Sequence, residues 1–153
     1  MGVQNRQKLS ASLEDYLEAI FNLSGEGNGA RSKDIAEALG VARSSVTGAF
    51  QVLKDKGLAN YRPYGCITLT ASGQAAASEV VRKHNILKSF FVRVLGVDDA
   101  IAQQAACRSE HALGTEIISR LLSFIEYVTE SSKNGHDVVE EFRQFYELRG
   151  VKP

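Results

Sequence analysis

The strongest constraint on the fold is a pair of amphipathic segments separated by two residues, the first of them a glycine. Residues 31–39 and 42–56 each repeat apolar side chains at helical spacing, and Gly40 stands between them, where a helix commonly ends. The apolar positions are Ile35, Ala36 and Leu39 in the first segment, and Val46, Ala49, Phe50 and Leu53 in the second. Small Ala36 permits a close crossing of two helices, and we expect Val41 to be the buried residue of the turn. The pattern predicts a helix-turn-helix.

The flanking segments extend this motif. Residues 9–23 predict a preceding helix with Ser12 as its N-cap. After Gly57, two short runs at residues 58–60 and 66–70 surround a turn that contains proline and glycine, which predicts a hairpin. A helix, a short helix, a longer helix and a hairpin in this order are typical of a winged helix-turn-helix, a fold that binds DNA.

Helical patterns cover most of the remaining chain. They run from Thr70 or Ser72 to Leu95, over 98–113, over 115–128 and over 137–148, with a polar loop at 131–135. We therefore predict a mainly α fold, in which a winged helix-turn-helix DNA-binding domain (residues 1–72) precedes an all-helical domain (residues 73–153). The last helix is expected to serve domain or dimer packing, although its aromatic face could instead meet a partner.

The charge distribution supports DNA binding locally. The chain has 18 basic and 18 acidic residues, which argues against polyanion binding by the whole surface. Between residues 42 and 64, however, Asp55 is the single acidic residue, against four basic ones. Arginine, lysine and short polar side chains at a helix start suit phosphates and base edges. The candidate DNA-binding residues are Arg31, Ser32, Arg43, Ser44, Ser45, Thr47, Gln51, Lys54 and Arg62. The alternative is that these side chains are only the solvated faces of a small helical protein.

The same sequence excludes a membrane or secreted protein as the expected class. No apolar run approaches the roughly 20 residues of a membrane span, and the polar N-terminus lacks the apolar core of a signal peptide. We therefore expect a cytoplasmic protein. In that compartment a structural disulfide between Cys66 and Cys107 is not expected.

A second constellation consists of groups that bind metals. Cys107, Glu110 and His111 stand at i, i+3 and i+4, so a helix would place them on one face. Asp15 and Glu18 repeat the i, i+3 spacing in the first helix, and His84 lies in the long helix. If these helices pack together, the ligands converge. Each residue also has an ordinary reading: helix-dipole charges for Asp15 and Glu18, core residues for His84 and Cys107, a solvated charge for Glu110.

The donor types set the expected metals. Carboxylates suit Mn²⁺ and Fe²⁺, imidazole suits most first-row metals, and a thiolate favours softer ions. The expected cofactor is thus a divalent transition metal, Fe²⁺ or Mn²⁺, for which Co²⁺, Ni²⁺ or Zn²⁺ could substitute.

At these residues the sequence resembles the diphtheria-toxin-repressor-like, iron- and manganese-dependent repressors, in a short, two-domain form. Residues 12–20, 32–46, 82–84 and 106–111 carry the resemblance, which extends over about residues 12–128. It implies a homodimer that binds a near-palindromic operator in double-stranded DNA when metal is bound, and that represses manganese or iron homeostasis genes. It also implies that residues 73–153 bind metal and dimerise.

The resemblance also assigns ligands residue by residue. Asp15 and Glu18 match the manganese-type first-helix ligands, and Cys107 matches the iron-type branch. His84, Glu110 and His111 match ligands shared across the family. Because the chain mixes both patterns, the choice between iron and manganese, and between one ion and two, stays open. Lys88 and Gln103 stand where iron-type members carry ancillary ligands, so that accessory site is expected to be absent.

Two other functions are compatible with the residues. One is a winged-helix regulator that senses a small molecule or thiol oxidation through Cys107. The other is a metal-dependent hydrolase with Glu110 as base beside His111 and His84, for which the sequence offers no nucleophile elbow. We expect no enzyme, because a metal held by many protein ligands leaves little room for substrate.

Overall fold

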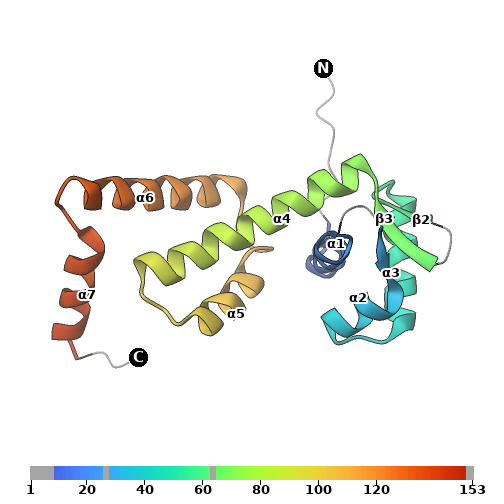
Figure 1. The fold of residues 1–153 in the computed structure, drawn as a ribbon, viewed down its shortest axis with the longest axis horizontal. Coiled ribbons are helices and arrows are strands. Elements are labelled where there is room, and N and C mark those ends of the chain that lie inside the picture. Colours follow the sequence, from blue (N-terminus) through green and yellow to red (C-terminus); the bar gives the residue numbers. More distant parts are fainter. Residues whose placement is uncertain (1–8, 26–27, 63–64, 151–153) are drawn as a thin grey trace, which may run out of the picture. The chain divides into compact units, whose positions relative to one another are not determined.

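The structure is a computed structural model that describes residues 9–25, 28–62 and 65–150. Contacts divide the chain into two compact units, residues 1–81 (unit 1) and 82–153 (unit 2), with the division inside helix α4 (Ala71–Ser89). The domain boundary expected after residue 72 stays a prediction. The mainly α fold class, with its N-terminal winged helix-turn-helix, is confirmed (Figure 1).

Unit 1 holds three helices and a small sheet before α4 begins. These elements are α1 (Ala11–Leu23), β1 (Ala30–Arg31), α2 (Ser32–Leu39), α3 (Arg43–Asp55), β2 (Ala59–Arg62) and β3 (Cys66–Leu69). The hydroxyl of Ser10 accepts a hydrogen bond from the Leu13 amide at 3.3 Å and caps α1. The prediction that Ser12 is this cap is therefore wrong by half a turn, because Ser12 already lies inside the helix.

The turn between α2 and α3 is closed by backbone groups. Gly40 adopts a left-handed conformation with φ 64°, which favours glycine, and its N–H points to the carbonyls of Ala36 and Glu37. The amide of Val41 donates to the Ala36 carbonyl at 3.0 Å. The Val41 side chain is 37% exposed, so its expected burial is wrong. The amide, rather than the side chain, turns inward.

The sheet has one strand more than the predicted hairpin. Its order is β1-β3-β2, and both pairings are antiparallel. Strand β1 pairs Ala30 with Ile67 and Arg31 with Cys66. A strand of two residues carries no alternation that a sequence pattern could reveal, which explains why β1 was not predicted.

The core of unit 1 is built where the helices meet the sheet. Its fully enclosed side chains come from every element, and they include Leu17, Ile20, Ile35, Leu53 and Ile67, each at most 1% exposed. The buried stripe of α3 consists of Val46, Phe50 and Leu53, which leaves the opposite face of that helix in solvent. The exposed face of α3 is thus the one opposite these three buried side chains.

The regular elements of unit 2 are all helices in the part of it that the structure describes. It contains the end of α4, then η2 (Phe90–Val94), α5 (Asp99–Ser109), α6 (Thr115–Lys133) and α7 (Val138–Leu148). The long helix expected up to Leu95 ends at Ser89 and continues as the π-helical η2. Helix α6 extends through Lys133, into the predicted loop. The core of unit 2 contains residues of α4, η2, α5 and α6, among them Leu87, Ala106 and Ile118.

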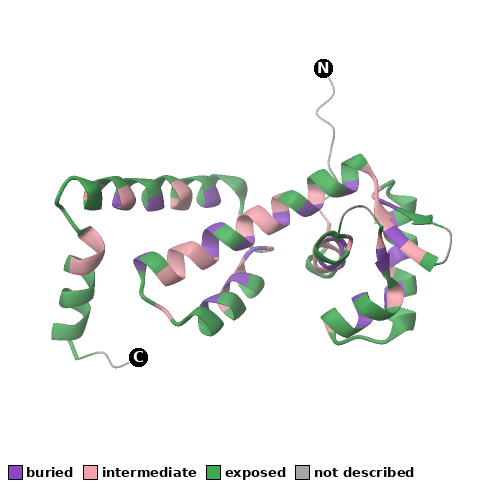
Figure 2. Ribbon diagram, in the orientation of Figure 1, coloured by how far each residue is buried: buried purple, intermediate pink, exposed green. Residues whose placement is uncertain are grey.

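Helix α7 contacts α6 but contributes no buried residue among those described (Figure 2). Its exposed aromatic side chains include Phe145, which is 54% exposed. No helix in the described part of the chain has the length and apolar character that a membrane crossing requires.

Candidate metal centre and DNA-binding surface

Unit 2 contains a buried carboxylate next to a buried imidazole. Glu110 is 1% exposed and His84 is 6% exposed, and Glu110 Oε2 lies 2.6 Å from His84 Nδ1. Glu110 is the C-cap of α5, where its amide donates to the Ala106 carbonyl. A carboxylate is disfavoured at the negative end of a helix. The position of Glu110 is therefore not explained by the stability of α5.

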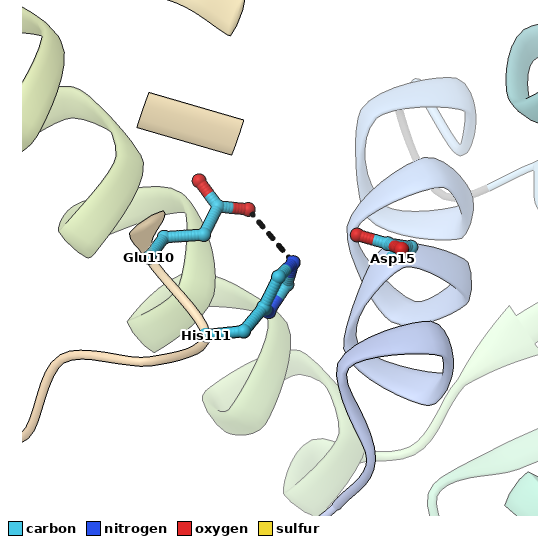
Figure 3. A group of neighbouring side chains, drawn as sticks. All are labelled: Asp15, Glu110 and His111. Atoms are coloured by element: carbon cyan, nitrogen blue, oxygen red, sulfur yellow. Dashed lines mark ion pairs between the residues drawn. The ribbon is translucent and has the colours of Figure 1, made fainter. Parts of the chain in front are cut away.

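Two further donors surround this pair. His111 follows Glu110 directly, and its Nε2 lies 3.4 Å from Glu110 Oε1, an ion pair drawn in Figure 3. Cys107 lies on the last turn of α5, with its Sγ 3.8 Å from His84 Nδ1. Contacts of Glu110 with both histidines, and of His84 with Cys107, thus bring together four of the six donors that the sequence predicts.

This donor set fits a divalent transition metal. Burying a carboxylate is costly unless charge or hydrogen bonds compensate for it. The imidazoles of His84 and His111 contact Glu110, and the thiol of Cys107 lies against His84. Two donor atoms bound to one ion at about 2.1 Å lie roughly 3 Å apart. The separations of 2.6, 3.4 and 3.8 Å bracket that value. Soft and hard donors occur together, so donor chemistry alone selects no single ion.

Asp15 and Glu18 lie in unit 1, on α1. Asp15 is drawn on that helix in Figure 3, and Glu18, one turn further along, is half-buried. Their spacing of three residues places both carboxylates on the same side of α1. That they complete the set of ligands in unit 2 stays a prediction.

The solvent face of α3 carries most of the predicted DNA-binding residues. Those exposed on this helix are Arg43, Ser44, Ser45, Thr47, Gln51 and Lys54. The Thr47 hydroxyl donates to the Arg43 carbonyl at 3.1 Å, and the Gln51 amide donates to Asp55 Oδ1 at 2.8 Å. Ser32 is the first residue of α2 and is half-buried. Their contacts with DNA stay predictions.

The sheet brings two of the predicted cations into one row. Arg31 on β1 and Arg62 on β2 both pair with Cys66 on the central strand. Residues directly opposite one another in antiparallel strands share a face of the sheet. Arg31 and Arg62 therefore stand on the same face of the sheet, and both are exposed. The sequence predicted each arginine separately as a DNA-binding residue. Their alignment could not be predicted, because strand β1 was not.

Comparison with protein families accounts for both units. A family described as "Iron dependent repressor, N-terminal DNA binding domain" matches residues 8–67. One described as "Iron dependent repressor, metal binding and dimerisation domain" matches residues 70–138.

Individual relatives agree with these families. An uncharacterised HTH-type transcriptional regulator of Methanocaldococcus jannaschii is 40% identical over 77% of this chain and 95% of its own length. The HTH-type transcriptional regulator MntR of Shouchella clausii is 36% identical over 84% of this chain and 90% of its own length.

A solved manganese-dependent transcriptional repressor in complex with manganese is similar in structure, with a TM-score of 0.69 and 29% identity over 75% of this chain. The match covers 53% of that structure, so the present chain spans about half of its length.

Proposed function

Because the chain belongs to the iron-dependent repressor family, we propose that it is a metal-activated transcriptional repressor that binds operator DNA as a homodimer. The observation that carries this proposal is the buried Glu110, with a histidine nitrogen near each of its carboxylate oxygens. We assign the protein a binding role in the cytoplasm and no catalytic step.

The four donors that lie together in unit 2 form the first part of the proposed metal centre. His84, Glu110 and His111 would hold the ion, and Cys107 would add a thiolate. A bound divalent ion supplies the positive charge that balances the buried carboxylate. Fe²⁺ or Mn²⁺ is the proposed cofactor, because carboxylates favour both, while Cys107 moves the preference towards iron and allows Co²⁺, Ni²⁺ or Zn²⁺ to substitute.

Asp15 and Glu18 are the proposed link to DNA. They lie on α1, whose buried face shares the core of unit 1 with α3. If they complete the coordination, metal binding restricts the freedom of the DNA-binding unit relative to the metal-binding unit. A dimer then presents two α3 helices at the spacing of about one DNA turn, roughly 34 Å. By linkage, metal tightens DNA binding only as far as it binds the DNA-competent state better than the free state.

The test is operator binding as a function of metal. A duplex is selected from a random library with wild-type protein and Mn²⁺, and its affinity is measured anaerobically with Mn²⁺, with Fe²⁺ and with a chelator. We expect at least a tenfold loss of affinity on chelation, which corresponds to the usual size of an allosteric coupling. Equal affinity with and without metal would contradict metal activation.

A matched pair of variants locates the centre. His111→Gln removes a proposed ligand, whereas His136→Gln makes the same change at a side chain that is 84% exposed in unit 2. We expect the first variant to lose metal-dependent DNA binding and the second to keep it. A repressor that responds to oxidation of Cys107 but not to the loss of His111 would instead support the thiol-sensing alternative. Asp15→Asn and Glu18→Gln, measured for both metal affinity and DNA binding, test the link to α1.

A further inference from the structure

The outermost stripe of α3 contains a glycine at its centre. Val46, Phe50 and Leu53 fix the buried side of the helix. Because each residue advances the helix by about 100°, the side chains that point directly away from the core are those near the opposite angle. They are Ser44, Gly48, Gln51 and Asp55, all of them exposed.

Gly48 has no role that the folded chain itself explains. Glycine inside a helix destabilises it relative to alanine, because glycine loses more backbone freedom on folding. Gly48 is not among the glycines with positive φ, and a Cβ added there would meet nothing within 4 Å. Alanine would therefore fit without strain and would favour the helix.

Other glycines of unit 1 show the contrast. Gly40 has a φ of 64°, and a Cβ on Gly73 would lie 1.9 Å from the Leu58 carbonyl oxygen. Each of these positions requires glycine for a reason inside the fold. At Gly48 the fold supplies no such reason, which draws attention to what could approach the helix backbone from outside.

We propose that Gly48 is the point of closest approach between α3 and the base edges of the DNA, and that it determines how deeply the helix enters the major groove. This inference rests on the proposed function. The major groove, about 12 Å wide, admits a helix, and a missing side chain at the outermost position lets the helix axis come nearer to the bases.

The neighbours of Gly48 fit that placement. Ser44 and Gln51 lie one turn to either side on the same stripe and reach the bases only if the helix sits deeply. The Gln51 amide donates to Asp55 at 2.8 Å, which holds its orientation and leaves its oxygen and second N–H for a base such as adenine. Arg43 and Lys54 lie on one flank of the stripe, where phosphate contacts are expected.

The experiment is a size series at position 48, measured on the full-length, Mn²⁺-loaded protein with the duplex selected by the wild type. Gly48→Ala is expected to raise the thermal midpoint by roughly 2 °C and to weaken DNA binding about tenfold. Gly48→Gln is expected to weaken binding further, about 100-fold, and to shift the preferred bases when selection is repeated. Metal affinity should not change in either variant.

Two controls separate the possible causes. Gly114→Ala adds a methyl group at the N-cap of α6, where φ is −74° and the space is also open, and should leave DNA affinity unchanged. Lys54→Ala should weaken binding to all sequences and lower the salt dependence, which the Gly48 variants should not do.

The outcomes are distinct. A Gly48→Ala protein that is more stable but binds DNA as tightly as the wild type overturns the role of Gly48 and leaves the proposed function intact. Equal losses for Ala and Gln also overturn it, because steric exclusion must grow with size. A wild type that takes up Mn²⁺ yet selects no duplex overturns the proposed function itself, and this inference with it.

Discussion

The two units bury different chemistry. Among the described residues, the buried side chains of unit 1 are aliphatic or aromatic, whereas the buried polar ones, His84 and Glu110, lie in unit 2. In unit 1 the predicted DNA-binding side chains of α3, together with Arg31 and Arg62, are exposed. A surface that meets a large polyanion must be exposed, while a centre that selects a small ion gains from donors held in place by packing. We therefore expect the stability of unit 1 to depend on apolar packing. The stability of unit 2 should depend in part on bound metal.

The largest effect is expected from a substitution that leaves a cavity in the apolar core of unit 1. Leu53 is 0% exposed on α3, so Leu53→Ala leaves a cavity and should cost about 3 kcal/mol of unfolding free energy. Denaturant unfolding measures the change. Val52→Ala is the control, because Val52 is the next residue of the same helix and is 40% exposed. Similar losses for the two variants would mean that α3 is not packed as described.

The second prediction concerns the buried polar pair of unit 2. Glu110→Gln keeps the shape and an acceptor for His84 but removes the charge, so the metal-free protein should stay within about 1 kcal/mol of the wild type. Metal present at 100 times its Kd should stabilise the wild type by about 2.7 kcal/mol and the variant hardly at all. Thermal unfolding with and without Mn²⁺ measures both quantities. A variant that retains the full metal-dependent shift would show that Glu110 is not a ligand.

The smallest effect is expected for an exposed ion pair of unit 2, which tests whether burial decides how much an ion pair contributes to stability. Arg120 and Glu116 on α6 form an ion pair of 2.9 Å, but their side chains are 80% and 79% exposed. Water and salt screen such a pair, so Arg120→Ala should change the unfolding free energy by less than about 0.5 kcal/mol. The comparison is made at low and at high salt. A loss above 1 kcal/mol would mean that geometry, and not burial, decides which ion pairs of unit 2 matter.

The sequence predicted the elements well where their periodicity was long. The helices corresponding to α1, α3 and α6 follow repeated apolar spacing, and their observed ends differ from the predicted ones by at most five residues, the largest difference being at the end of α6. It did not predict η2, where the Leu95 amide donates to the Phe90 carbonyl at 3.2 Å. Such a hydrogen bond between residues i and i+5 changes the backbone without changing the apolar pattern, so no residue type predicts it.

The candidate metal centre shows the same difference between what is local in the sequence and what depends on packing. Cys107, Glu110 and His111 could be grouped from the sequence, because they lie within five consecutive residues. The helix predicted over 98–113 ends at Ser109, however, so Glu110 is its C-cap and His111 lies in the turn beyond it. His84 comes from another helix, and only the packing of α4 against α5 brings its Nδ1 to 2.6 Å from Glu110. Spacing offered no measure of burial either, since a solvated glutamate at position 110 would have the same neighbours in sequence.

By itself, then, the sequence determined the helix-turn-helix, the helical second half, the candidate donors and the family to which they belong. The tertiary structure decided that Glu110 and His84 are buried together, that Arg31 and Arg62 stand in one row, and that Gly48 occupies the outermost position of α3 with open space around it. The reason is that helical periodicity arises from the backbone of one segment, whereas burial, strand register and open space depend on which distant segments meet.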